Sequence, residues 1–138
     1  MIKTFLLFLI SWLIPGSGFI MKGKYLRGFT LFSIITLIFF IGILMHGEVS
    51  LPNISPKDWG YNIMSVLSFA ISLGSGFLSI LSLLSIHFKL GLVNGLSYHP
   101  LYELALFFIV VAGAMNYFVV CNFYDRYYKK DKSEEKIN

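Results

Sequence analysis

Three histidines, His46, His87 and His99, are the side chains of this chain that titrate near neutral pH. His87 and His99 flank one polar connector, and Glu103 follows closely. A metal or acid–base site built from these three residues is conceivable. The histidines share no close spacing, however, and Glu103 suits the start of a helix, where a carboxylate meets the positive end of the helix dipole. We therefore expect loop and helix-start residues here, and no catalytic residue, metal or cofactor.

The other reactive groups lead to the same expectation. Cys121 is the single cysteine, so no internal disulfide can form, and its apolar neighbours predict a small buried hydrophobic side chain. The sequence contains no nucleophile elbow, phosphate-binding loop, dinucleotide fingerprint or thiol metal site. No reaction is therefore indicated by a local motif.

The strongest pattern is a stripe of serines spaced alternately three and four residues apart, which places them on one face of a helix. This serine stripe consists of Ser65, Ser68, Ser72, Ser75, Ser79 and Ser82. Small side chains let helix backbones approach closely in lipid, and the hydroxyls can bond a neighbouring helix. The stripe predicts close helix packing. A polar path for an ion or solute is the alternative, but it would need an ionisable group at mid-depth, and residues 62–86 contain none.

A second small-residue face lies near the C-terminus, and it is formed by Ala105, Ala112, Gly113 and Asn116. We expect this face to pack against the serine stripe. Asn116 lies well inside an apolar run, where an unpaired amide is costly, so it should hydrogen-bond a serine across the interface. A clamp between helices is favoured over a substrate-binding role.

Composition indicates which elements position these residues. The 138 residues are 57% hydrophobic and 13% charged, with a mean hydropathy of +0.75, which leaves too little polar surface for a soluble domain. The formal charge of +4 comes from residues between apolar runs and in the tail, so we expect the lipid bilayer as partner and no nucleic acid. The prediction is an all-α integral membrane bundle in one domain, residues 1–125, followed by a solvated basic tail, residues 126–138.

Four apolar runs supply the expected helical segments, at about residues 4–21, 29–45, 61–86 and 101–124. Pro15-Gly16 breaks the first run, because proline removes a backbone donor, so this segment either crosses with a bend or re-enters. The third run is longer than a crossing needs and should tilt, kink near Gly74-Ser75-Gly76 or project from the bilayer. A cleaved signal peptide is the competing interpretation of the first run, since Lys3 precedes a short apolar core.

Glycine-rich and basic connectors lie between and after these runs. The residues expected to form membrane turns are Pro15, Gly16, Gly18, Gly23 and Gly28. The residues expected at lipid headgroups are Lys22, Lys24, Arg27, Arg126, Lys129 and Lys130.

Orientation depends on the number of crossings. With four crossings, the side that holds both termini carries seven basic residues: Lys3, Lys57, Arg126 and the lysines at 129, 130, 132 and 136. The other side carries four, so cytoplasmic termini are favoured. If the first segment only re-enters, the termini fall on opposite sides and the count becomes nearly even. His46 would lie on the face opposite to His87 and His99.

Two stretches of the chain carry a recognisable pattern. The first is Trp12-Leu13-Ile14-Pro15-Gly16-Ser17-Gly18, followed by Lys22-Gly23-Lys24 and Arg27-Gly28. The second is Ala112-Gly113-Ala114-Met115-Asn116, followed by Asn122-Phe123-Tyr124-Asp125-Arg126. Together they resemble a family of small bacterial membrane proteins of unknown function. The first is also similar, more distantly, to the domain family of two transmembrane helices joined by a glycine-containing turn. The resemblance implies about four helices in a bacterial cytoplasmic membrane.

A packing face without accompanying chemistry predicts a protein whose work is assembly. We expect a structural or accessory subunit of a larger membrane complex, or a homo-oligomer built through small-residue faces. The alternative is a small transporter or channel-like protein lined by the serine stripe and Asn116. A membrane enzyme acting at His87, His99 and Glu103 is the third hypothesis, and it requires that these side chains share one site.

Overall fold

The computed structural model describes residues 2–49, 51–52, 59–91, 93 and 95–129. Within these ranges the regular elements are all helical, as the sequence predicts. They are α1 (Ile2–Leu13), α2 (Ser17–Met21), α3 (Tyr25–Leu44), α4 (Trp59–Ser72), the 3-10 turn η1 (Leu73–Ser75), α5 (Phe77–His87), α6 (Tyr102–Tyr124) and the π-helical turn η2 (Asp125–Lys129).

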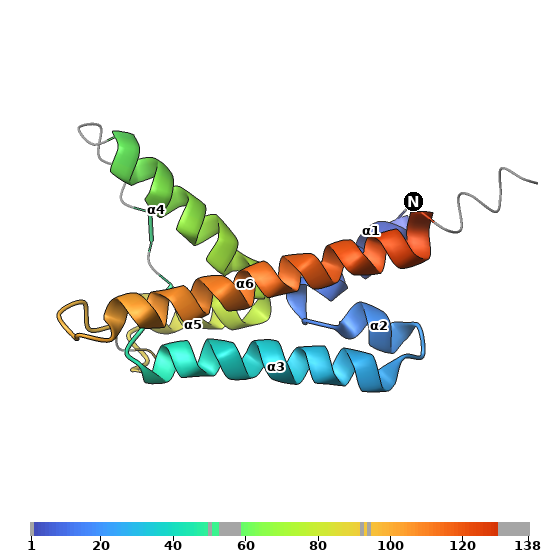
Figure 1. Cartoon of the computed structure of the whole chain (residues 1–138), viewed down its shortest axis with the longest axis horizontal. Helices are drawn as coiled ribbons and strands as arrows, with labels where there is room; N and C mark the ends of the chain where they lie inside the picture. Colours follow the sequence, from blue (N-terminus) through green and yellow to red (C-terminus); the bar gives the residue numbers. More distant parts are fainter. Residues whose placement is uncertain (1, 50, 53–58, 92, 94, 130–138) are drawn as a thin grey trace, which may run out of the picture.

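Two long helices, α3 and α6, lie side by side in opposite directions and form the frame of the bundle (Figure 1). They are the two described helices that are each long and apolar enough to cross a membrane. The 20 residues of α3 extend about 30 Å, which matches the hydrocarbon thickness of a bilayer. α3 begins at Tyr25, earlier than the apolar run predicts, because the connector residues before Phe29 form its first turn.

The first and third apolar runs fold back on themselves. α1 reaches the middle of the bundle, the chain turns at Pro15-Gly16, and α2 returns to the end where α1 began (Figure 1). α4 and α5 meet at a bend of 115° next to Gly76, whose φ is 61°, so the kink expected near Gly74 is a reversal. By length and composition this bent pair could count as a third span, but both of its outer ends lie at one end of the bundle.

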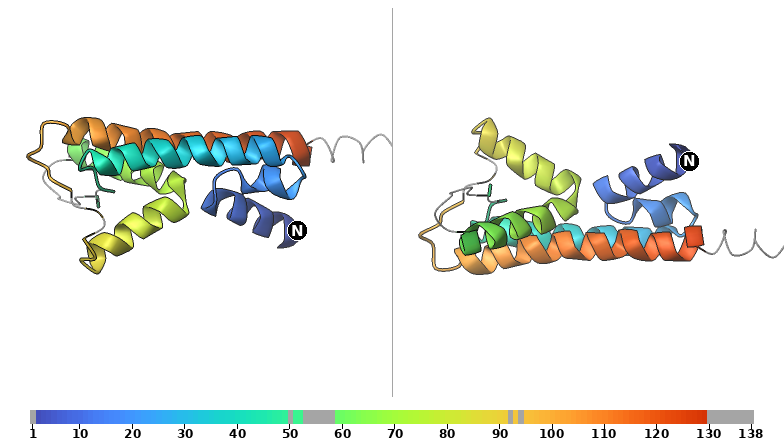
Figure 2. Two further views of the ribbon diagram at one scale, coloured as in Figure 1. Left: turned by 90° about the horizontal axis from the view of Figure 1, so that it is seen from below. Right: turned by 90° about the horizontal axis from the view of Figure 1, so that it is seen from above.

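Each half of the chain is therefore a hairpin followed by a long helix. The two hairpins enter from opposite ends, and their tips meet near the middle of α6 (Figure 2). The tetrapeptide Gly-Ser-Gly-Phe occurs at both tips, at residues 16–19 and 74–77. The halves thus have the arrangement of an inverted repeat, which is common among proteins built from broken membrane helices.

The same hydrogen bond closes both hairpins. Ser17 Oγ on α2 donates to the carbonyl oxygen of Ile10 on α1 at 2.9 Å. Ser79 Oγ on α5 donates to the carbonyl oxygen of Ser72 on α4 at 2.5 Å. Each donor lies seven residues after its acceptor, so one small side chain ties the returning arm to the entering arm. In both hairpins a serine hydroxyl thus supplies a hydrogen bond to a main-chain carbonyl, which lipid could not provide.

The buried core lies along α6. Ile35 and Phe39 of α3 belong to the same buried cluster as Ile109 of α6. Near the other end of α6, Phe19 of α2 packs edge-on against Phe123, with ring centroids 5.6 Å apart. The aromatic contact fixes α2 beside the C-terminal part of α6 and so supports the first hairpin.

Large apolar side chains cover the outside of the bundle. Leu26, Phe118 and Phe5 are 87%, 76% and 70% exposed. Such a surface suits contact with acyl chains. Together with the two helices that are long and apolar enough to cross a bilayer, it indicates a membrane protein. Cys121 is also exposed, so its predicted burial is wrong, because only one face of α6 packs against the other helices.

Candidate functional site

The reversal beside Gly76 divides the serine stripe among three elements. Ser65, Ser68 and Ser72 lie on α4, Ser75 lies in η1, and Ser79 and Ser82 lie on α5. The last four are buried, Ser65 is half-buried and Ser68 is exposed. The single continuous helix that the spacing implied is wrong, because the period of three and four continues in sequence across a turn that reverses the chain. Most of the stripe therefore packs within the chain, and Ser68 on α4 faces outward.

The closest backbone contact in the site joins α6 to α4 and η1. A Cβ atom on Gly113 would overlap the carbonyl oxygen of Ile71, and one on Gly74 would overlap the carbonyl oxygen of Gly113. Ala105 and Ala112, on the same helix as Gly113, are fully buried. Gly113 thus lies against α4 and η1, whereas the neighbours of Ala105 include Gly42 of α3 and Gly47 just after α3, so this end of the small-residue face packs on the α3 side.

Asn116 joins both hairpin tips to α6. Its Nδ2 donates to the carbonyl oxygen of Trp12 at 2.8 Å and to that of Gly74 at 2.7 Å. One carbonyl comes from each hairpin, at the end of a helix, where carbonyls lack the next turn's donors. The side chain is fully buried. The serine partner expected from the sequence is wrong, because the broken helices present main-chain carbonyls to this amide.

A groove of about 600 Å³ opens where α4 diverges from α6 (Figure 1). Ser65 and Ser68 of α4 line one wall, and Phe107 of α6 lines the other. Glu48 and Glu103 also line the groove. It therefore combines apolar walls with hydroxyls and two carboxylates, a composition that suits a helix face or an amphiphile.

The end of the bundle that holds Glu48 also holds two histidines. The rings of His46 and His99 lie with their centroids 4.9 Å apart. The expectation that His46 lies on the opposite face is wrong, because the third apolar run returns to the end it came from. Glu103 lies in the first turn of α6, as expected. Among the described residues, no group of three or more His, Cys, Asp or Glu side chains is placed to hold a metal ion.

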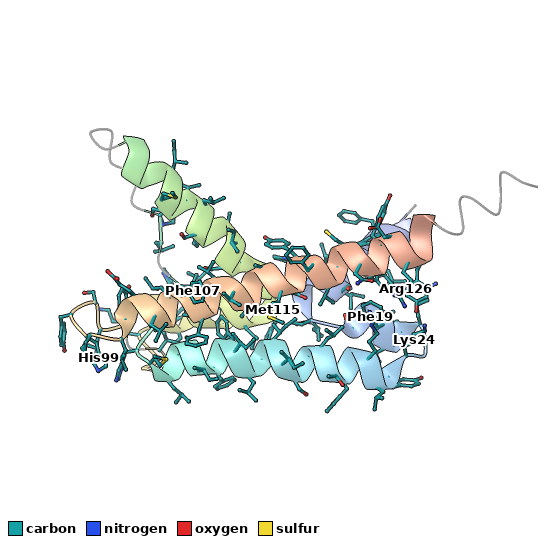
Figure 3. The ribbon with its side chains drawn as sticks, viewed as in Figure 1. Phe19, Lys24, His99, Phe107, Met115 and Arg126 are labelled. Atoms are coloured by element: carbon teal, nitrogen blue, oxygen red, sulfur yellow. The ribbon has the colours of Figure 1, made fainter. Side chains whose placement is uncertain are left out.

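The other end of the bundle is basic. Figure 3 shows Lys24 and Arg126 at this end and His99 at the other. The Arg27 guanidinium lies 5.0 Å from the ring centroid of Phe19, and Lys22 Nζ lies 5.7 Å from that of Tyr127. These rings hold the cations at the rim of the aromatic cluster. The side chain of Lys129 and the whole of Lys130 lie outside the described residues.

The predicted membrane turns occupy two different depths. Pro15 and Gly16 form the tip of the first hairpin, and Gly18 lies on α2. A Cβ atom on Gly16 would overlap the carbonyl oxygen of Gly28 on α3. Gly23 lies in the connector at the basic end, with nothing within 4 Å of its Cβ position. Gly16 and Gly28 thus mark a close backbone contact, whereas Gly23 marks a surface turn.

One sequence feature that indicates the junction between the hairpins was missed, because the serine stripe is the more regular pattern. Two apolar segments interrupted by the same Gly-Ser-Gly-Phe tetrapeptide, in corresponding places of the two halves, predict paired breaks at mid-depth. The acceptors Trp12 and Gly74 carry no signal of their own, since they act through main-chain carbonyls.

Comparison with known proteins gave one match. Residues 6–135 match a family of unknown function (DUF6677), so the matched region holds both long helices, the second hairpin and all but the first residues of α1. No curated protein and no solved structure matches the chain. The expected kinship with an uncharacterised family is confirmed, and the likeness to the family of two transmembrane helices stays a prediction.

Proposed function

We propose that this chain, which belongs to the family of unknown function DUF6677, is a multi-pass protein of the bacterial cytoplasmic membrane that acts as a structural or accessory subunit. Membership of this family names no reaction. The proposal rests on one observation, which is that α4 leaves the bundle and exposes part of the serine stripe.

The distribution of basic residues supports an orientation. Seven of the lysines and arginines lie in described segments, and six of these are at the end where α1 begins and η2 finishes: Lys3, Lys22, Lys24, Arg27, Arg126 and Lys129. Lys89 belongs to the other end, together with Glu48 and Glu103. Because cytoplasmic segments carry the excess of lysine and arginine, we place both termini in the cytoplasm.

Cysteine labelling tests this orientation. In a Cys121→Ser background, Tyr98→Cys should react with a membrane-impermeant maleimide in intact spheroplasts, since Tyr98 is 82% exposed at the non-cytoplasmic end. Met21→Cys, 57% exposed at the basic end, should react only after the membrane is permeabilised. The reverse labelling pattern would place the termini outside the cytoplasm.

α4 packs against α6 through its C-terminal part. There Ile71 meets Gly113, and the hydroxyl of Tyr117 donates to the carbonyl oxygen of Ala70 at 2.9 Å. Towards the N-terminus, Ile63 and Met64 are 62% and 68% exposed. A helix that carries serines and stands apart in lipid gains packing and hydrogen bonds when a second helix covers it.

A second copy of α4 is the occupant that we propose for the groove. Ser65, which is half-buried, and Ser68, which is exposed, line the groove along α4. Two copies related by a two-fold axis would therefore place small side chains against small side chains, as a self-complementary interface requires. The protein would then act as a dimeric scaffold in its membrane.

Disulfide trapping tests the α4 contact. In the Cys121→Ser background, Ser68→Cys should form a cross-linked dimer on oxidation in native membranes. Two-fold packing should bring the two Cα atoms at residue 68 within the roughly 4.4–6.8 Å that a disulfide can span. Leu37→Cys, 60% exposed on α3, is the matched control and should stay monomeric. Equal cross-linking at both positions, or none at Ser68→Cys, would contradict the interface.

Opposed hairpins also occur in transporters, where they surround a site at mid-depth. Here the junction is filled by backbone: a Cβ atom on Gly76 would overlap the carbonyl oxygens of Trp12 and Leu13. The described residues that meet there include no charged side chain, and the Nδ2 of Asn116 is engaged by two carbonyls, although its Oδ1 has no partner. The geometry therefore supports a structural role for the hairpins better than a path for solutes.

A further inference from the structure

A second cavity, separate from the groove beside α4, lies between α3 and α5. Its volume is about 210 Å³, and its walls are formed mainly by apolar side chains such as Phe39, Ile43 and Leu78. Two serines of α5, Ser82 and Ser85, complete the lining. The cavity is thus an apolar space, and the two serines lie beside it with their Oγ atoms buried.

These hydroxyls have no hydrogen-bond partner. Ser82 and Ser85 are 3% and 1% exposed, and the Oγ atom of each is buried and unpaired. Ser72 and Ser79, earlier in the same part of the chain, both donate to main-chain carbonyls. Leaving a buried hydroxyl unpaired is unfavourable, so these two sites favour a ligand that supplies an acceptor oxygen.

The position of the serines along α5 indicates the kind of acceptor. α5 ends at His87, so Ser85 and Ser82 lie about 3 Å and 8 Å below its end at 1.5 Å per residue. With the end of α5 placed at the membrane surface, these distances along an oblique helix put both serines just beneath the headgroups, where polar headgroup and acyl chain meet. Lys89 follows Ser85 by about one turn and is exposed. A cation just past the end of α5, two serines in its last turns and an apolar space beside them match a phosphate, an ester carbonyl and an acyl chain in that order.

We propose that this cavity binds one glycerophospholipid of the non-cytoplasmic leaflet. The upper part of one acyl chain fills the space between α3 and α5, and its ester carbonyl accepts hydrogen bonds from Ser82 and Ser85. The phosphate lies near Lys89. The inference uses the membrane placement proposed above but not the α4 interface, so either can fail while the other stands.

Ester and ether lipids provide the test. Delipidated protein in mild detergent is titrated with palmitoyl-oleoyl phosphatidylglycerol and with its dialkyl ether analogue, and lipid-bound fractions are measured by native mass spectrometry. The ester lipid should bind about five- to tenfold more tightly, which is the gain expected from one or two net hydrogen bonds. Equal affinities of the wild-type protein for the two lipids would overturn the proposal without any variant.

Variants then assign the contact to the serines. Ser82→Ala/Ser85→Ala should lower the affinity for the ester lipid to that for the ether lipid and leave the ether lipid unaffected. Ser33→Ala, on an exposed position of α3, should change neither affinity. Lys89→Gln should weaken both lipids by the same factor, since both carry the phosphate. A double variant that loses both lipids equally would show that the hydroxyls do not recognise the carbonyl.

Discussion

Replacing Asn116 by leucine is expected to lower the free energy of unfolding in detergent by about 2–4 kcal/mol. Leucine keeps the approximate size of the side chain but removes the donor shared by the carbonyls of Trp12 and Gly74. Both carbonyls would then be buried without this partner at a depth where water does not replace it. Because one carbonyl belongs to each hairpin, the loss should loosen both hairpin tips together.

The measurement is unfolding in mixed dodecyl maltoside and dodecyl sulfate micelles, followed by far-UV circular dichroism. Asn122→Leu is the matched control, since Asn122 lies on the same helix but is exposed, and its replacement should change stability by less than about 0.5 kcal/mol. If Asn116→Leu is as stable as the wild-type protein, the amide does not hold the junction, and the hairpins depend on packing alone.

The long helices were predictable because their signal is local. α3 and α6 arise from uninterrupted apolar runs, and each can satisfy its own backbone hydrogen bonds in lipid. The breaks at Pro15-Gly16 and near Gly74 were predictable for the same reason, since proline and glycine act on the backbone where they stand. What could not be predicted is the direction of the chain after each break. That direction depends on contacts between distant segments, such as the one between Gly76 and Trp12.

The serine stripe shows how a local pattern can predict the right kind of contact in the wrong element. Its regular spacing suggested one helix from Ser65 to Ser82, yet the chain reverses between Ser72 and Ser79. After the reversal the spacing still buries Ser79 and Ser82, because α5 packs its own small-residue face. Helical periodicity therefore identified the packing residues, while the partners of those residues required the tertiary fold.

The partner of Asn116 was unpredictable for a related reason. The sequence identified a buried amide that needs acceptors, and the structure supplies two, but both are main-chain carbonyls exposed by breaks 42 and 104 residues away. The position of His46 was unpredictable for the same reason, because it lies beside His99 only if the third apolar run returns to the end of the bundle where it began. Both predictions, a serine partner for Asn116 and a place for His46 on the opposite face, failed because the broken apolar runs turn back instead of crossing.

Replacing Gly16 by alanine is expected to lower the free energy of unfolding by about 2–4 kcal/mol, whereas Gly23→Ala should cost only about 1 kcal/mol. The two glycines have nearly the same φ, 78° and 79°, so alanine meets a similar backbone strain at both. They differ in surroundings: the Cβ position of Gly16 overlaps the carbonyl oxygen of Gly28, and that of Gly23 has nothing within 4 Å.

The difference between the two variants isolates the backbone contact that holds the returning arm of the first hairpin against α3. Alanine at residue 16 must push the hairpin tip away from Gly28, and this displacement also moves the nearby Trp12 carbonyl away from Asn116. Gly16→Ala and Asn116→Leu should therefore be less than additive when combined, because the first change already weakens the hydrogen bond that the second removes. Equal losses for Gly16→Ala and Gly23→Ala would mean that α2 and α3 do not touch at this point, and the first apolar run would then have to be placed as a crossing rather than a hairpin.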